Sequence, residues 1–201
     1  KEEAEKHVSL GDRAMFYAPY EAFGKDKIVG KAFDDRAGCV MLIDMIQSEL
    51  EYDCTFSFTV MEENGCIGGM AAAYRVNPDY AIAIETTTAA DISGVEPANQ
   101  VCRQGEGAAV LYGDRGTIYH AELFQLALDT AKKHDIPCQV KEGLYGGNEG
   151  RVLQTAREGA RTLTISLPCR YLHSATCMLD TRDIESMRRL LEVFTAEMAN
   201  R

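Results

Sequence analysis

Residues 80–86 have the sequence Tyr-Ala-Ile-Ala-Ile-Glu-Thr, and this stretch decides the fold of the chain. The apolar run from Tyr80 to Ile84 does not alternate with polar residues, which is typical of a strand that is buried on both faces. Residues 161–167 form a second strand candidate, which ends at Pro168. A strand that is buried on both faces belongs to a sheet that helices cover on both sides, so the stretch at 80–84 favours an α/β protein.

Helix and strand patterns alternate on both sides of this stretch. Helices are expected at 36–50, 68–76, 119–134 and 181–200, and residues 1–10 are interpreted as the end of a helix. Strands are expected at 12–17, 27–29, 52–61, 107–112 and 138–141. Asp180 and Thr181 are candidate N-caps of the last helix. The alternation predicts a mixed, largely parallel central sheet flanked by helices.

The charge balance restricts the partners of the chain. Among its 201 residues, 31 are Asp or Glu and 21 are Lys or Arg, which gives a formal net charge of −10. Nucleic acid and anionic membranes are therefore not expected as partners, because binding them requires a positively charged surface. The most apolar stretch, residues 39–46, is short and contains Asp44, so no membrane-spanning segment is predicted. A negative field suits cations, either metal ions or substrates with a free amine.

The seven cysteines indicate a reducing compartment. Their number is odd, and no pair has the C-x-x-C spacing. We therefore expect buried, reduced thiols in a cytoplasmic protein rather than a disulfide framework or a zinc knuckle.

Carboxylate or imidazole side chains follow four of the expected strands. They are Asp34 and Asp35 after 27–29, Glu62 and Glu63 after 52–61, Glu85 after 80–84, and His173 after 161–167. Ligand sites of such sheets lie at the carboxyl ends of the strands, so we expect one crevice lined by these groups. Crowded carboxylates repel each other, and a multivalent cation offsets that repulsion. Oxygen ligands with one imidazole predict a site for zinc, cobalt or manganese.

Each of these groups also has a simpler explanation when it is considered alone. The alternatives are a helix N-cap for Asp34 and Asp35, a solvated loop for Glu62 and Glu63, a strand end for Glu85 and a structural histidine for His173. The placement of all four groups after strands favours a shared site over four separate explanations.

Four short motifs resemble those of a known family. They are Phe33-Asp-Asp-Arg-Ala-Gly38, Val60-Met-Glu-Glu-Asn-Gly-Cys-Ile-Gly68, Ala81-Ile-Ala-Ile-Glu-Thr86 and Pro168-Cys-Arg-Tyr-Leu-His-Ser174. In this order and spacing they resemble the glutamyl and deblocking aminopeptidases, which are co-catalytic metallopeptidases that form tetrahedral (TET) particles. The resemblance covers almost the whole chain from Lys31. It implies the fold of a co-catalytic zinc aminopeptidase, a homo-oligomer and removal of N-terminal residues from peptide substrates.

The resemblance also implies a role for each motif residue. Asp34 would bridge two divalent metal ions, either zinc or cobalt with manganese as an alternative, and Glu62 would be the general base. Glu63 and His173 would be terminal ligands of one ion. Glu85 would bind the other ion, at a position where many members have Asp. A strained, often cis, peptide would follow Asp34.

Two departures from the family pattern affect these expectations. A further histidine ligand, which the family carries in a His-x-Asp segment, has no counterpart among the four histidines of this chain. We therefore expect residues 1–30 to be the tail of an inserted β-barrel-like domain, and residues 31–201 to be a catalytic domain that is incomplete at its N-terminus. The loop at 146–149 reads Gly-Gly-Asn-Glu where the family often has Gly-Gly-Thr-Asp. Its residues Gly147, Asn148 and Glu149 are expected to bind substrate.

These observations leave three functions open. The first is a metal-dependent aminopeptidase with a dinuclear site, and this chain by itself is expected to be inactive or nearly so. The second is a non-catalytic homologue or inactive fragment that serves as a structural or assembly subunit. The missing histidine favours the second function, and the intact Glu62 opposes it. The third is a glycosidase, whose two carboxyl groups must lie on opposite sides of one bond, a geometry that adjacent Glu62 and Glu63 suit less well.

Overall fold

The strands expected at 80–84 and 161–167 pair with each other in the computed structural model, which describes residues 1–201. β3 (Tyr80–Thr88) and β6 (Arg161–Cys169) run parallel along their whole length. β4 (Ala108–Val110) is antiparallel to β6 and parallel to the edge strand β5 (Cys138–Val140). The strand order is β3-β6-β4-β5, so the main sheet is mixed, as the sequence predicts.

A second, smaller sheet connects the two ends of the chain. β1 (Glu21–Ala22), β2 (Lys27–Gly30) and β7 (Cys177–Asp180) pair in antiparallel fashion in the order β1-β2-β7. The register places Gly30 opposite Cys177. The chain that leads into the first α-helix therefore lies beside the chain that returns from β6.

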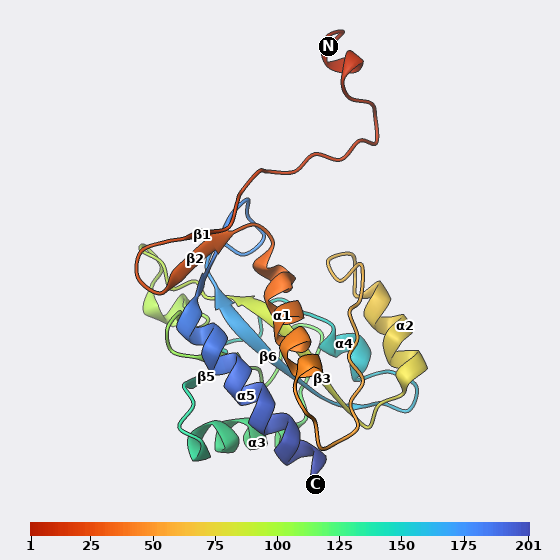
Figure 1. The fold of residues 1–201 in the computed structure, drawn as a ribbon, viewed down its shortest axis with the longest axis vertical. Helices are drawn as coiled ribbons and strands as arrows, with labels where there is room; N and C mark the ends of the chain where they lie inside the picture. The colour runs from red at the N-terminus through yellow and green to blue at the C-terminus, as the bar shows by residue number, and fades with distance from the viewer.

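Five α-helices surround the main sheet (Figure 1). They are α1 (Phe33–Gln47), α2 (Ile67–Val76), α3 (Ala121–Lys133), α4 (Gly150–Leu153) and α5 (Thr181–Ala199). Two 3-10 turns, η1 (Ala4–Lys6) and η2 (Pro97–Asn99), complete the elements. α5 packs on α3, α1 and the strands β4 and β6, whereas α2 packs on α4, which in turn contacts β3 and β6. This arrangement of helices around a mixed sheet confirms the predicted α/β fold class.

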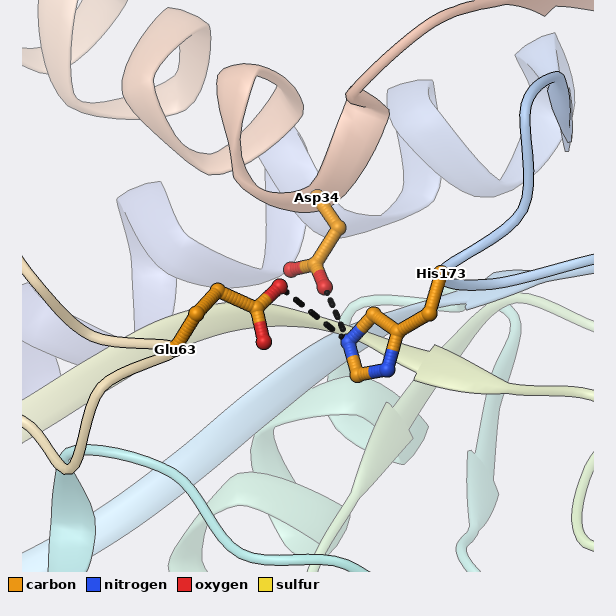
Figure 2. A group of neighbouring side chains, drawn as sticks. All are labelled: Asp34, Glu63 and His173. Carbon is orange, nitrogen blue, oxygen red and sulfur yellow. Dashed lines mark hydrogen bonds and ion pairs between the residues drawn. The ribbon is translucent and has the colours of Figure 1, made fainter. Parts of the chain in front are cut away.

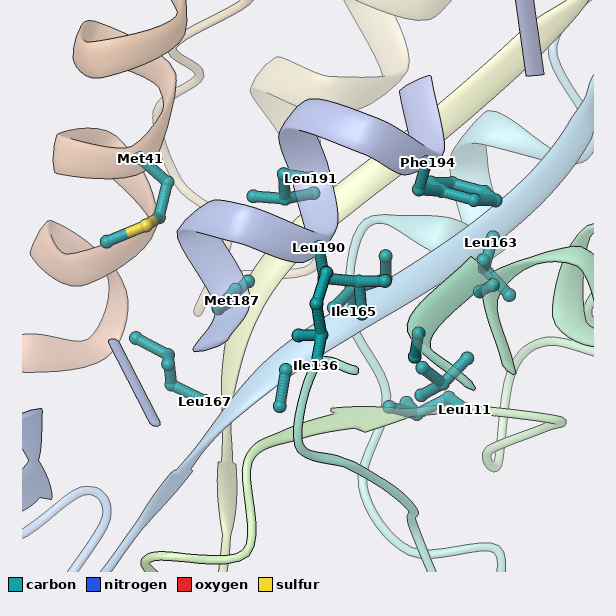
Figure 3. Close-up of a cluster of buried hydrophobic side chains, with 14 of the residues drawn as sticks. Met41, Leu111, Ile136, Leu163, Ile165, Leu167, Met187, Leu190, Leu191 and Phe194 are labelled. Carbon is teal, nitrogen blue, oxygen red and sulfur yellow. The ribbon is translucent and has the colours of Figure 1, made fainter. Parts of the chain in front are cut away.

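The core lies between α5 and the main sheet. The large buried apolar residues of α5 are Met187, Leu190, Leu191 and Phe194, which is the i, i+3, i+4, i+7 pattern of one helix face. They pack against Leu163, Ile165 and Leu167 of β6 (Figure 3). Each such side chain stabilises the fold by roughly 1.5–3 kcal/mol when it is fully buried. This layer fixes β6, from whose carboxyl end the predicted histidine ligand follows.

Asp180 is the N-cap of α5, as the sequence predicts. Its carboxylate accepts a hydrogen bond from the backbone N–H of Arg182 at 2.9 Å, and it forms ion pairs with the Arg182 guanidinium and with Lys27. Burial raises the pKa of the Asp180 carboxyl, but the hydrogen bonds from Arg182 and Lys27 outweigh burial and lower that pKa to about 2. Asp180 therefore connects α5, β7 and β2.

Three expected elements differ from the structure. Residues 1–10 contain only η1, and residues 12–17 form no strand. Residues 52–61 also form no strand, and Phe58 and Val60 in this segment are 50% and 67% exposed. The alternation of apolar residues with other residues in 52–61 is typical of one face of a strand. A strand also requires a neighbouring strand edge that accepts and donates backbone hydrogen bonds. β3 and β5 are the edge strands of the main sheet, and the segment 52–61 pairs with neither of them.

The N-terminal segment leads away from the rest of the molecule (Figure 1). Almost all of its side chains before Glu21 are exposed. The division into a domain tail at 1–30 and a catalytic domain at 31–201 stays a prediction, and β2 joins the two parts by pairing with β7. All seven cysteines are free, and four of them are buried. No helix has both the length and the apolar character that crossing a membrane requires.

Candidate metal centre

Three of the predicted ligands come together in the structure (Figure 2). Asp34 lies at the start of α1, Glu63 in the loop before α2, and His173 in the loop between β6 and β7. His173 Nε2 lies 3.0 Å from Asp34 Oδ2 and 3.2 Å from Glu63 Oε1. One ligand atom from each residue lies within 4.8 Å of the other two. A single ion is therefore able to contact all three residues.

The loop that presents His173 has an unusual backbone. Tyr171 and His173 both have φ of +60°, which is uncommon for residues other than glycine and is concentrated at functional sites. Arg170 fixes the start of this loop, because its guanidinium donates to both oxygens of Asp91 at 2.7 and 2.8 Å. Arg170 also exchanges two backbone hydrogen bonds with Met178. The loop is thereby closed at its base, with the imidazole at its far end.

Asp34 and Asp35 interrupt the beginning of α1 and have different surroundings. Both have non-helical φ and ψ, and the peptide bond between them is cis, as the family resemblance implies. Asp35 Oδ1 accepts a hydrogen bond from the N–H of Gly38 at 3.1 Å, as a helix-capping residue does. Asp34 makes no such bond and lies against His173 instead. The capping explanation therefore applies to Asp35 and not to Asp34.

A second group of carboxylates shares Asp34. Asp34, Asp35 and Glu85 each offer an oxygen within 4.8 Å of the others. Glu85 lies on β3 opposite Ser166, is 7% exposed, and has no hydrogen-bond donor at its carboxylate. Burial raises the pKa of Glu85 to about 10, and the charges of Asp35 and Glu62 add to that effect. A buried carboxylate without a donor requires either a proton or a cation.

The chemistry of both groups fits divalent cations. Burial raises the pKa of Asp35 to about 8 although the N–H of Gly38 opposes the increase, so the second group contains two carboxyls whose ionised forms are destabilised by burial. A cation offsets both burial and mutual repulsion. Asp34 belongs to both groups. Oxygen donors with a single imidazole suit zinc, cobalt or manganese.

Glu62 lies next to these groups with a different environment. Burial raises the pKa of its carboxyl above the ordinary value, a hydrogen bond from the Cys66 thiol at 3.5 Å opposes the increase, and Glu63 and Asp34 add to it. The backbone turns directly after Glu63, where Gly65 has φ of +106°. The N–H groups of Gly65 and Cys66 both donate to the carbonyl of Glu62 at 2.9 Å. This turn lets the adjacent side chains of Glu62 and Glu63 have different surroundings.

The predicted substrate loop is partly occupied by internal hydrogen bonds. Asn148 is buried, and its Oδ1 accepts from the N–H of Gly150 at 2.8 Å and from the hydroxyl of Thr164 at 3.1 Å. Glu149 accepts a hydrogen bond from the hydroxyl of Thr59. Gly147 is exposed, with no atom near the position of a side chain. The binding of substrate by Gly147, Asn148 and Glu149 stays a prediction.

Sequence reasoning did not find the partners that hold these loops. Asp91 lies 79 positions from Arg170, and Thr59 lies 90 positions from Glu149. Asp91 stands in no motif or periodic pattern, and the alternating pattern of 52–61, in which Thr59 stands, gives no sign of its contact with Glu149. The one sequence signal for Asp91 is that it follows the strand β3 by three positions, near the end of the sheet where ligand sites are expected.

Comparison with known proteins agrees with this geometry. A sequence profile of the family described as M42 glutamyl aminopeptidase matches residues 1–190. Aminopeptidase APDkam598 of the archaeon Desulfurococcus kamchatkensis is 33% identical with a TM-score of 0.91, and the match covers 98% of this chain and 57% of that one. A Thermotoga maritima structure named as an endoglucanase is 36% identical with a TM-score of 0.76, covering 98% of this chain and 58% of that one.

A third solved structure is an assembled peptidase. The TET1 peptidase of Pyrococcus horikoshii, which can assemble into a tetrahedron or a large octahedral shell, is 29% identical with a TM-score of 0.80. The match covers 96% of this chain and 57% of that one. The chain thus spans somewhat more than half the length of the relatives that it matches.

Proposed function

This chain belongs to the M42 glutamyl aminopeptidase family, and on that premise we propose that it forms the larger part of a metal-dependent aminopeptidase that removes N-terminal residues from peptides. The observation that carries the proposal is the convergence of Asp34, Glu63 and His173 from the start of α1 and two separate loops. A second carboxylate group with Glu85 lies directly beside them. This arrangement supports a site for two divalent cations.

The ligands divide between the two cations through Asp34. Asp34, Glu63 and His173 would hold one ion, and Asp34 with Glu85 would hold the other. When bound there, a pair of divalent ions supplies a Lewis acid for the scissile carbonyl and lowers the pKa of an attacking water. Zinc and cobalt are the proposed metals, with manganese as an alternative.

Glu62 is the proposed general base. A carboxylate oxygen of Glu62 takes a proton from the attacking water and then delivers it to the nitrogen of the leaving amine, so that one peptide bond breaks and one water is consumed. The raised pKa of Glu62 suits this exchange, because a general base works best when its pKa approaches the working pH. The thiol of Cys66 holds the Glu62 carboxylate in place.

The two metal positions are unequal in this chain. His173 is the only histidine in either group of ligands. His134 pairs with Glu197, and His7 belongs to the exposed N-terminal segment. The group with Glu85 therefore consists of carboxylates alone. We propose that this chain by itself binds one ion tightly and a second one weakly, and that it has little or no peptidase activity.

Assembly and the alternative functions follow from the comparisons. Because the TET1 peptidase of Pyrococcus horikoshii assembles, we propose that this chain forms homo-oligomers. A structural subunit without catalysis remains the alternative for this chain. The relative named as an endoglucanase keeps glycoside cleavage as a second candidate.

One set of measurements separates these functions. The metal content of the purified chain is determined first, and the complete gene product is then assayed with added cobalt on aminoacyl-anilides and on glycosides. Tight binding of one ion by the chain, with anilide cleavage by the complete product, supports the aminopeptidase. Glycoside cleavage alone would establish the second candidate. Metal binding with neither activity in the complete product would leave the structural subunit.

A further inference from the structure

We propose that Glu149, together with Arg151, is a positioning residue that fixes the segment carrying Glu62 and Glu63. This segment, residues 60–68, is called the Glu-Glu loop below. The inference deepens the proposed function and rests on it for the roles of Glu62 and Glu63. The contacts themselves are independent of that function.

The Glu-Glu loop is closed internally by backbone hydrogen bonds. The N–H of Gly68 donates to the carbonyl of Val60 at 3.0 Å, and the N–H of Ile67 donates to that of Met61 at 3.3 Å. Together with the turn at Gly65, these bonds give the loop a defined shape. They do not place it relative to β3 or β6, because both partners of each bond belong to the loop.

The chain before the loop gives it little support. Residues 52–61 pair with no strand, and Val60 and Met61 are 67% and 55% exposed. In a complete sheet, a strand before a catalytic loop is held by its ladder. Other contacts must therefore fix the position of Glu62 and Glu63 next to Asp34 and His173.

Two side-chain hydrogen bonds from the start of α4 provide these contacts. Glu149 Oε1 accepts a hydrogen bond from the hydroxyl of Thr59, directly before the loop. Arg151 Nη2 donates to the carbonyl of Gly65 at 2.9 Å, at the turn of the loop. Glu149 thus holds the base of the loop, and Arg151 holds its tip. The first bond is partly buried and the second is exposed, so Glu149 is expected to contribute more.

The residues that hold the loop are themselves anchored in the core. Asn148, next to Glu149, accepts hydrogen bonds from Thr164 of β6 and from the N–H of Gly150. Tyr119 donates to Asp114 at 2.6 Å beside this asparagine. Asn148 thus ties the short segment that carries Glu149 and Arg151 to β6, and these two side chains contact Thr59 and the Glu-Glu loop.

The start of α2 is shaped to let Glu149 approach. A Cβ at Gly69 would lie 2.6 Å from Glu149 Oε1, and a Cβ at Gly68 would lie 2.5 Å from the carbonyl oxygen of Val60. Real Cβ atoms essentially never make such close contacts. The two consecutive glycines thus allow the carboxylate of Glu149 and the backbone of Val60 to occupy space that any side chain would fill.

Fixing the loop matters because catalysis is sensitive to the position of the base. A displacement of about 1 Å costs on the order of 100-fold in rate. If Glu149 instead contacts substrate directly, its replacement changes KM rather than the motion of the loop.

Hydrogen exchange of the loop amides tests the inference without any assay of activity. The amides of Gly65, Cys66, Ile67 and Gly68 are the reporters, because each donates a hydrogen bond within the loop. In the chain with Thr59→Val or Glu149→Ala, these amides should exchange about tenfold faster, as expected for loss of one hydrogen bond. Glu149→Gln, which keeps an accepting oxygen, and Thr59→Ser, which keeps the hydroxyl, should exchange like the unchanged chain.

A matched control is available for Arg151. Arg157 Nε donates to the carbonyl of Tyr74 at 2.6 Å, outside the Glu-Glu loop. Arg151→Met should speed exchange at Gly65 and Cys66, whereas Arg157→Met should leave these amides unchanged. Unaltered exchange in Thr59→Val, Glu149→Ala and Arg151→Met would overturn the inference.

Steady-state kinetics of the complete gene product test the positioning role. Thr59→Val and Glu149→Ala should lower kcat about tenfold or more, with KM within about twofold of its original value. Thr59→Ser, which keeps the hydroxyl, should have the kcat of the unchanged protein. A raised KM with unchanged kcat in Glu149→Ala would assign substrate contact to Glu149 and reject positioning. If the complete product cleaves no peptide, the proposed function fails, while the exchange measurements still decide whether the loop is held as described.

Discussion

His173 Nε2 lies 3.0 Å from Asp34 Oδ2, although 139 positions separate the two residues in the chain. Glu63 Oε1 lies 3.2 Å from the same nitrogen. One ring nitrogen carries at most one proton and so donates to only one of these carboxylates. A cation bound by all three residues satisfies both carboxylates at once, which is the basis of the first prediction.

His173→Ala should remove the tightly bound ion. The imidazole is the only nitrogen ligand of its group, and its loss leaves Asp34 and Glu63 as two carboxylates that repel each other. Metal analysis of the chain after dialysis against a weak chelator is the measurement. His134→Ala is the control, because His134 pairs with Glu197 and belongs to neither group. Equal metal content in both variants would contradict the assignment of His173 as a ligand.

Glu62→Gln should abolish peptide hydrolysis by the complete gene product and leave its metal content unchanged. Glutamine keeps the shape of the side chain but does not accept the proton of the attacking water. Loss of a general base typically costs about 10²–10⁴-fold in rate. The rate on an aminoacyl-anilide and the metal content are measured on the same preparation. Near-normal turnover would remove Glu62 from the mechanism.

Asp180 should make the fold sensitive to acid. Its pKa is about 2 in the folded chain and 3.8 as an ordinary value, so the folded state prefers the ionised carboxyl. The resulting stability is fully present above about pH 4 and is lost as the pH falls toward 2. Asp180→Asn should cost about 2 kcal/mol at neutral pH, through the weakened cap and the lost charged hydrogen bonds.

Urea unfolding between pH 2 and pH 7 measures this dependence. Other carboxyls also titrate in this range, including Glu197, whose pKa is about 2 as well. The informative quantity is therefore the difference between the unchanged chain and Asp180→Asn, which should shrink as the pH falls. A difference that stays constant down to pH 2 would show that the charge of Asp180 does not contribute.

The chain should associate with itself as its concentration rises. α1 exposes Val40, Ile43 and Ile46 by 44–50%, and the unpaired segment 52–61 exposes further apolar side chains. Exposed apolar surface and unpaired backbone both favour association. Sedimentation velocity should show this, and the double substitution Ile43→Lys with Ile46→Lys should reduce it. Ile118→Lys, at an isolated residue that is 88% exposed, is the control and should have no effect.

Much of the fold was predictable because its signals are local. β3 begins with a continuous apolar run, β6 alternates apolar residues with Thr and Ser, and the cap and apolar face of α5 lie within one segment. Residues 52–61 could not be assigned correctly, because their alternation says nothing about whether a neighbouring edge exists. The same limit applies to α1, where the spacing of apolar residues predicts the helix but does not show that Val40 and Ile46 remain exposed.

The candidate site was predictable to a different degree. Asp34, Glu63, Glu85 and His173 follow strands that the sequence predicts, and such strand ends are expected to meet at one edge of a sheet. In the structure Glu85 lies on β3 and His173 follows β6, whereas Asp34 follows β2 of the smaller sheet and Glu63 follows a segment without a strand. The structure places them in two groups that share Asp34. The residues that hold the loops, such as Asp91 and Thr59, depend on contacts across many positions. These contacts form only when the chain has folded, so no spacing in the sequence indicates them.

The register between β2 and β7 restricts the distance between the ligands Asp34 and His173, because a short segment connects each ligand to this pair of strands. Gly30 lies opposite Cys177, Asp34 follows Gly30 by four positions, and His173 precedes Cys177 by four. Two chain segments with the same number of residues therefore connect the ligands to the same residue pair. A single inserted residue lengthens one of these segments by up to about 3.5 Å, which exceeds the distance from a metal ion to its ligand. Loop length is thus a constraint on these eight positions, and natural or engineered insertions are better tolerated almost anywhere else on the surface.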